Sequence, residues 1–180
     1  MLSITIPGFE LYDEQTNRIE TIKGRDLQLE HSLVSISKWE SKWKKPFLSN
    51  KERTREETID YIRCMTLTQN VDNRIYQGIT YENVKAVNDY INDSMTATTF
   101  NKNSNNRSSR SIITSEIIYY WMISLEIPME CQKWHLNRLL TLIRVCDEKS
   151  QPGKKMSKKD VMRQYSSLNA ARKSKYGTRG

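Results

Sequence analysis

The amino-acid sequence predicts an α+β fold that is predominantly helical. Apolar and polar residues alternate over residues 1–31, which is the period of a strand, whereas apolar residues recur every three or four positions over residues 32–148. Residues 151–180 hold nine basic side chains and one acid, so this segment carries the whole net charge of +8. We therefore expect a single globular domain of residues 1–150, with a small N-terminal antiparallel β-sheet and a core of about five helices, followed by a basic C-terminal arm of residues 151–180 that forms a helix or tail.

Short alternating runs predict the N-terminal strands. The run "LSITIP" alternates apolar and polar residues and stops at Pro7, and "FELY" repeats the alternation after Gly8. Two further runs lie on either side of a turn signal at residues 24–26. These runs predict two to four strands in one small antiparallel sheet.

The first helix is predicted behind Ser32, a residue type that caps helix N-termini, and Pro46 ends its pattern. Its apolar positions are Leu33, Ile36, Trp39 and Trp43. A second helix is expected from Thr54, because Glu57 stands three residues later and completes a capping box. Its apolar face would hold Ile59, Ile62 and Met65. The acids at its start, Glu56, Glu57 and Asp60, are explained by favourable interaction with the helix dipole.

A third helix is predicted from Thr80, with an apolar face formed by Val84, Val87, Tyr90 and Ile91. The chain then continues as "SMTATTFNKNSNNRSSRS", whose first part favours an extended conformation. Residues 101–110 contain no apolar side chain, so they are expected to form an exposed loop. The segment is compatible with a β-hairpin near residues 95–113 that has this loop at its tip.

Two helices are predicted on either side of Pro128, and they are expected to form the centre of the core. The first has a wide apolar stripe of Ile113, Ile117, Trp121 and Leu125, with Ile118 and Met122 beside it. The second runs from about residue 130 to residue 146 and buries Trp134, Leu136, Leu139, Leu140, Ile143 and Cys146. A last helix is expected after Ser157, with a weak apolar stripe of Val161, Tyr165 and Leu168. We expect this helix to fold when a partner covers the stripe.

Cys131, His135 and Cys146 are the only residues in the chain that suggest a metal or catalytic centre. Cys131 and His135 are four residues apart on the predicted helix and could face the same side. A structural zinc site usually takes its four ligands as close pairs, and the sequence has no CxxC or HxxxH pair. Cysteine on an apolar stripe is commonly a small buried hydrophobe with an unreactive thiol. We therefore interpret these residues as core packing and predict no metal and no cofactor.

Other catalytic signatures are missing from the sequence. It contains no GxSxG elbow, and its six glycines do not form a phosphate-binding loop. We predict a non-enzymatic protein without a small-molecule substrate. The longest apolar run, "IIYYWMI", is too short to span a bilayer, and three unpatterned cysteines indicate a reducing compartment.

The basic arm is the candidate binding site. Its only aromatic residues are Tyr165 and Tyr176, so stacking on nucleic-acid bases is poorly supported, although its charge is compatible with phosphate binding. Weak amphipathic pattern mixed with positive charge favours docking onto an acidic or helical protein. A solvated chain end is the alternative interpretation. The candidate partner-binding residues are Lys154, Lys155, Lys158, Lys159, Arg163, Tyr165, Leu168, Arg172, Lys173 and Lys175.

Four strings in the chain are distinctive: "LEHSLVSISKWESKWKKPFL" (29–48), "YIRCMTLTQNV" (61–71), "IITSEIIYYWMISLEIPMECQKWHLNRLLTLIRVC" (112–146) and the ending "LNAARKSKYGTRG". They resemble the tail assembly chaperones of tailed bacteriophages. The resemblance covers most of the chain, but residues 101–110 are richer in Asn and Ser than the family pattern.

The resemblance implies a protein of the host bacterial cytoplasm that binds the long, helix-rich tape-measure protein while the tail tube polymerises around it. Such chaperones are typically absent from the finished virion and often occur in a short and a frameshifted longer form. It is also compatible with a homo-oligomer, and it assigns no role to an individual residue. Two alternatives remain open: a structural tail or connector component of the virion, and a phage nucleic-acid-binding protein that uses the basic arm.

Overall fold

A computed structural model shows an α+β chain, which confirms the predicted fold class. It describes residues 1–13, 17–49, 52–100, 112–150 and 158–177. These residues form four strands, six α-helices and two short 3₁₀ helices, η1 and η2. The chain divides into two compact units, Met1–Arg144 and Val145–Gly180, whereas the sequence pattern placed the boundary after residue 150.

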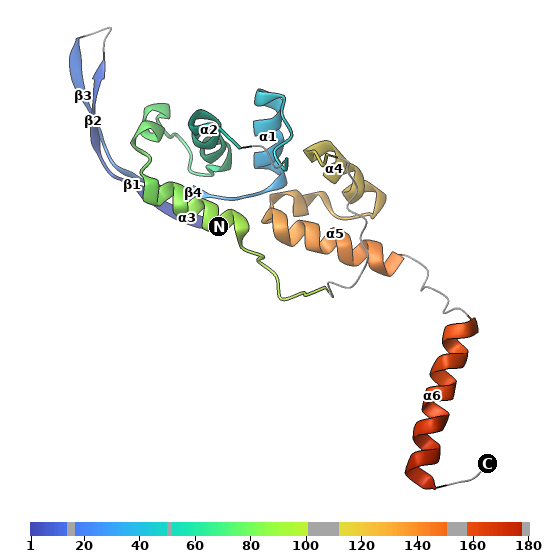
Figure 1. Cartoon of the computed structure of the whole chain (residues 1–180). Helices are drawn as coiled ribbons and strands as arrows, with labels where there is room; N and C mark the ends of the chain where they lie inside the picture. Colours follow the sequence, from blue (N-terminus) through green and yellow to red (C-terminus); the bar gives the residue numbers. More distant parts are fainter. Residues whose placement is uncertain (14–16, 50–51, 101–111, 151–157, 178–180) are drawn as a thin grey trace. The chain divides into compact units, whose positions relative to one another are not determined.

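The four strands form a nested antiparallel hairpin rather than a single sheet. β1 (Leu2–Ile6) pairs with β4 (Arg25–Leu29), and between them β2 (Phe9–Asp13) pairs with β3 (Arg18–Ile22). In Figure 1 the β2–β3 part of the ribbon extends away from the helices of the first unit.

The two parts of the ribbon meet where Gly8 and Gly24 lie side by side. A Cβ atom on Gly24 would lie 2.7 Å from the amide nitrogen of Gly8 and 2.8 Å from the carbonyl oxygen of Ile6. Only glycine fits this backbone approach without a shift of the chain. The ribbon buries one face, as a period of two requires, through Ile4, Ile6, Leu27 and Leu29.

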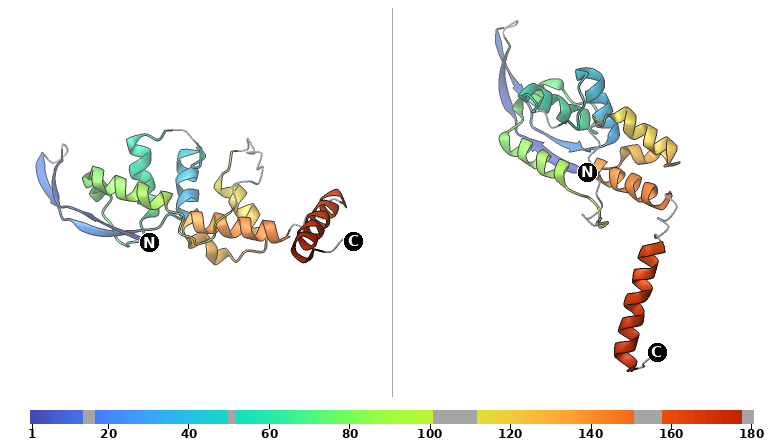
Figure 2. Two further views of the ribbon diagram at one scale, coloured as in Figure 1. Left: turned by 60° about the horizontal axis from the view of Figure 1, so that its bottom comes forward. Right: turned by 45° about the vertical axis from the view of Figure 1, so that its right-hand side comes forward.

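Helices α1 (Leu33–Trp43) and α2 (Arg55–Met65) pack together beside this ribbon, as Figures 1 and 2 show. Their predicted N-caps, Ser32 and Thr54, are both present as capping boxes. Their buried side chains include Leu33, Ile36, Trp39, Tyr61, Ile62 and Met65, whereas Ile59 of the predicted apolar face is half-buried. The largest fully buried side chains come mostly from the ribbon, α1, α2 and the loop between these two helices. The centre of the core therefore lies there rather than at the two helices around Pro128.

Helix η1 (Asn73–Gly78) precedes α3 (Tyr81–Asn92), which has Thr80 as its cap and contacts β1. Val87 and Tyr90 are buried, and Val84 and Ile91 are half-buried. Residues 93–100 and 112–114 contain no strand. The rest of the segment for which a hairpin was considered, with the predicted loop, lies outside the described residues.

The last elements of the first unit are α4 (Ser115–Ser124), η2 (Met129–Lys133) and α5 (Leu136–Ser150), the last of which continues into the second unit. The single helix predicted from about residue 130 is therefore wrong at its start. The chain is extended at Trp134, and the backbone of His135 bridges to Ser32. The amide of Leu136 donates to the carbonyl oxygen of His31 at 2.7 Å, which fixes the first turn of α5. The second unit contains α6 (Lys158–Tyr176).

Candidate functional site

The two histidines of the chain lie together in the core. The His31 and His135 rings are 5.1 Å apart, and only 2% of His31 and 6% of His135 is exposed. The Nδ1 atom of His31 shares a hydrogen bond with the hydroxyl of Tyr61, and Nε2 of His135 lies 3.0 Å from the backbone oxygen of Tyr90. Burial lowers the pKa of His31 to about 3, and the neighbouring His135 and Arg53 contribute to this shift. The pair thus joins α2, α3 and the start of α5 as a hydrogen-bonded packing element in which His31 is neutral.

Cys131 is buried in η2, so it does not share a helix with His135 as the sequence predicted. Cys146 is half-buried on α5, and burial raises the pKa of the third thiol, Cys64. Within the described ranges, no three His, Cys, Asp or Glu side chains are grouped so that they could hold a metal ion.

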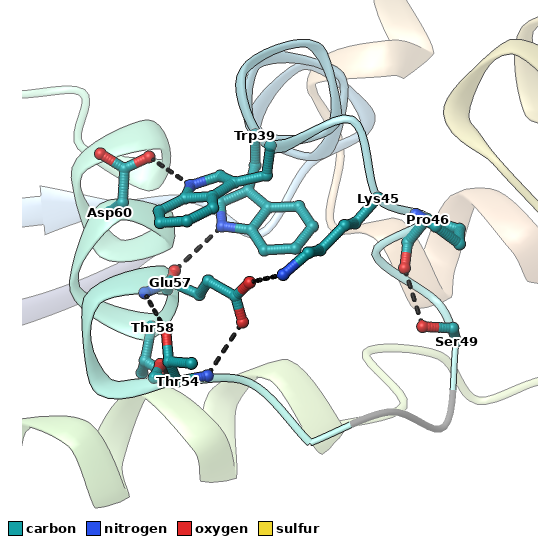
Figure 3. Close-up of polar contacts among 9 residues, drawn as sticks. Trp39, Lys45, Pro46, Ser49, Thr54, Glu57, Thr58 and Asp60 are labelled. Atoms are coloured by element: carbon teal, nitrogen blue, oxygen red, sulfur yellow. Dashed lines mark hydrogen bonds and ion pairs between the residues drawn. The ribbon is translucent and has the colours of Figure 1, made fainter.

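The acids at the start of α2 tie this helix to α1, as Figure 3 shows. The Glu57 carboxylate accepts from the amide of Thr54 at 2.9 Å and pairs with Lys45, while its backbone oxygen accepts from the indole of Trp39 at 2.9 Å. Both Glu57 and Asp60 are largely buried, with 3% and 5% of their surface exposed. The helix dipole alone therefore does not explain them.

Asp60 makes the second tie between the two helices. It accepts from the indole of Trp43 at 2.9 Å and pairs with Lys42 and Arg63. Burial opposes the charge on Asp60, but the hydrogen bonds from Lys42 and Trp43 outweigh it and lower its pKa. A carboxylate held ionised in this way stabilises a packed pair of helices and is a poor proton donor.

Two hollows open beside Arg53. One, of about 220 Å³, is lined by Trp39, Lys45 and the paired Glu57, and the other, of about 380 Å³, has His31 and asparagine side chains in its wall. The Arg53 guanidinium donates to the backbone oxygen of Phe47 at 2.6 Å and lies 3.8 Å from the centre of its ring. The Arg53 guanidinium thus holds the loop before α2.

Helix α6 carries most of the predicted partner-binding residues, and every side chain described in it is exposed. The exposed members of the set are Arg163, Tyr165, Leu168, Arg172, Lys173 and Lys175. Lys158 and Lys159 are the first two residues of the helix, but their side chains are outside the description, and Lys154 and Lys155 lie outside the described residues.

The apolar surface of α6 is longer than the sequence pattern predicted. Tyr165 is 64% exposed and Leu168 46% exposed, and two further residues, Met162 at 76% and Tyr176 at 68%, extend their row. At about 100° of rotation per residue, these four side chains fall within roughly 120° of the helix surface. Met162 is three residues before Tyr165 and Tyr176 is eleven residues after it, and both spacings are typical of one side of a helix. The predicted stripe left out both residues and was therefore too short. We name Met162, Tyr165, Leu168 and Tyr176 the α6 stripe. Val161, which the sequence placed on it, has no described side chain.

Helix α4 has a second exposed apolar surface, which the sequence pattern did not predict. Ile118 and Met122 are fully buried, but Tyr120 is 66% exposed and Ile123 is 68% exposed on the opposite side. The predicted stripe residues Ile117 and Trp121 are only half-buried. The sequence feature that could have indicated this surface is that "SEIIYYWMIS" is apolar on all sides of the helix. Such a helix is usually covered on every side.

Comparison of the chain with protein-family models, with curated proteins and with solved structures finds no match. None of the described helices is both long enough and apolar enough to cross a membrane.

Proposed function

We propose that this chain is a non-enzymatic tail assembly chaperone of a tailed bacteriophage, which binds the tape-measure protein in the host bacterial cytoplasm. The observation that carries the proposal is the α6 stripe, four apolar side chains exposed on one side of a 19-residue helix in a separate compact unit. Exposed apolar side chains gathered on one side of a helix mark candidate sites of protein binding. The resemblance of the sequence to such chaperones names the client.

The α6 stripe suits a helical client because of its geometry. A helix presents apolar residues every three or four positions, and two such rows pack side by side over several turns. Arg172 lies within the α6 stripe and Lys175 at its border, and both favour a client with acidic residues beside its apolar row. Covering that row while the client waits for the tail tube would keep it from aggregating.

Co-purification tests the proposal. The full chain is expressed with the tape-measure protein, either unchanged or with Tyr165→Gln and Leu168→Gln, which remove two apolar side chains of the stripe and keep good helix formers. The matched control carries Ala170→Gln and Ser174→Gln on the opposite side of α6. We expect the stripe variant to lose the client and the control to keep it, while circular dichroism shows the same helix content in both. Equal recovery of the client by both variants would refute the proposal.

The charge of α6 favours one second candidate, nucleic-acid binding. Six of its 19 residues are Lys or Arg and one is Asp. Binding to duplex or single-stranded DNA would then be measured across a salt series, because phosphate contacts give a steep loss of affinity with salt. Tight binding near physiological salt that survives Tyr165→Gln and Leu168→Gln would favour this candidate. Detection of the chain by mass spectrometry in purified particles would instead favour a structural tail component.

A further inference from the structure

The exposed side of α4 is an apolar surface that none of the described residues covers. The helix packs against α1, and Figures 1 and 2 show it at the end of the row formed by α2, α1 and α4. Ile118 and Met122 face the core, whereas Tyr120 and Ile123 are two-thirds exposed. These two residues are three apart and therefore neighbours on the helix surface.

Acidic residues lie on α4 and shortly after it in the chain. Glu116 is one turn before Tyr120 on the same side of α4, and Glu126 and Glu130 follow the helix, all three being exposed. Lys133 is the only basic residue in the sequence from Ile112 to Lys133. We name Glu116, Tyr120, Ile123, Glu126 and Glu130 the α4 face.

The charge of the α4 face decides which helix can cover it. Two copies of the face packed together would bring acids against acids, and like charges in a contact oppose association. A suitable occupant needs an apolar row to cover Tyr120 and Ile123 and basic residues on its borders.

Helix α6 has both properties. The α6 stripe supplies the apolar row, and Arg172 and Lys175 lie within and beside it. With 19 residues, α6 is about 28 Å long, compared with about 15 Å for the 10 residues of α4, at 1.5 Å per residue. It is therefore long enough to cover α4 and reach the acids beyond its end.

We propose that α6 of a second copy of this chain docks on the α4 face. In the single chain the α4 face and the α6 stripe are both exposed, so each copy offers one surface of either kind. When two copies exchange their α6 helices reciprocally, both surfaces of both copies are covered and the assembly closes as a dimer. This inference does not depend on the proposed client, which would compete with the α4 face for the α6 stripe.

Sedimentation velocity on the full chain tests the proposal with two charge-reversed variants. The first carries Glu116→Lys and Glu130→Lys on the α4 face, and the second carries Arg172→Glu and Lys175→Glu on α6. We expect the unchanged chain to form a dimer that weakens as salt rises, and each variant alone to be monomeric. An equimolar mixture of the two variants should form a heterodimer with two contacts. In the first contact the basic α4 face of the first variant meets the acidic α6 of the second, so opposite charges are paired again. In the second contact the unchanged α4 face of the second variant meets the unchanged α6 of the first.

The recovery in the mixture separates lost contact from lost folding, since a variant that fails to fold cannot form the heterodimer. The control Ala170→Gln with Ser174→Gln, on the other side of α6, should stay dimeric. The proposal is overturned if the unchanged chain is monomeric at every concentration, as it would be with α6 folded onto its own α4. It is equally overturned if either variant alone keeps the dimer, or if the mixture stays monomeric.

Discussion

Acidification should destabilise the first unit through His31. This imidazole is only 2% exposed, and its surroundings disfavour a positive charge. The His135 ring is 5.1 Å away, and Phe47 and Tyr61 pack against the His31 ring. Arg53 adds a positive charge nearby. Burial first, and then His135 and Arg53, lower its pKa from 6.5 to about 3. The folded protein therefore keeps His31 neutral over the range in which an unfolded chain protonates it.

The size of the effect follows from linkage between proton binding and folding. Above pH 6.5 neither state binds the proton at His31, so this residue adds no pH dependence. Between pH 6.5 and about 3 only the unfolded chain binds it, and the free energy of unfolding falls by about 1.4 kcal/mol for each pH unit. The loss at pH 5 is about 2 kcal/mol, a large part of the stability of an ordinary domain. Asp60, whose pKa is lowered below 3.8, adds its own loss only in more acidic solution.

Urea unfolding followed by tryptophan fluorescence at pH 7.5 and pH 5 measures this loss. All four tryptophans belong to the unit Met1–Arg144, so the signal reports on the unit that contains His31. The comparison is with His31→Gln, which is less stable at pH 7.5 but has no imidazole to protonate at this position. His31 and His135 are the only histidines, and the variant retains His135. We expect the unchanged chain to lose about 2 kcal/mol more than the variant on going to pH 5. Equal losses in the two proteins would show that His31 does not carry the acid sensitivity.

Three further predictions concern the first unit. Ile62→Ala should lower the free energy of unfolding by about 2–5 kcal/mol because Ile62 is fully buried, whereas Leu67→Ala, at a half-exposed position, should change it by less than about 1 kcal/mol in the same urea titration. Gly24→Ala should lower the thermal midpoint, because its Cβ would collide with the backbone of Gly8, and an unchanged midpoint would contradict the nested ribbon. Cys131 should react with a thiol reagent only as fast as the protein opens, in contrast to the half-buried Cys146, and mass spectrometry of the labelled peptides distinguishes the two sites.

Helix starts are the part of the fold that the sequence predicts best. Ser32, Thr54 and Thr80 are observed as N-caps, each in a reciprocal contact with the residue three positions later. Such a cap is complete within four residues, so it is legible without knowledge of the rest of the chain. The same is true of the alternating runs that become β1–β4.

The start of α5 could not be predicted in this way. Trp134 and His135 are acceptable helix residues, and the break between η2 and α5 is fixed by the distant His31 and Ser32, whose backbones pair with Leu136 and His135. The prediction that Cys131 and His135 share one side of a helix failed for this reason. The local sequence pattern does not show that a carbonyl oxygen from a distant residue, here His31, will accept a hydrogen bond at this point.

Of the two candidate binding surfaces, one could be predicted from the sequence and the other could not. A run of basic residues with Tyr165 and Leu168 is visible in the sequence, and α6 exposes it. The exposed side of α4 was not predictable, because a helix that is apolar on all sides does not show which side faces the core. Tyr120 and Ile123 could be assigned to the surface only once α4 was seen to pack on α1 with Ile118 and Met122 buried.

The nested ribbon has a consequence for the order in which the chain acquires its structure during synthesis. Leu2 and Leu29 both precede α1 in the chain, so the ribbon can pair before the helices that follow it have left the ribosome. A two-stranded ribbon by itself is only marginally stable in water, and β1 gains its covering helix when α3 arrives. Chains truncated before α3 and released from the ribosome should therefore leave the ribbon open to proteases, and released chains that include Tyr81–Asn92 should protect it.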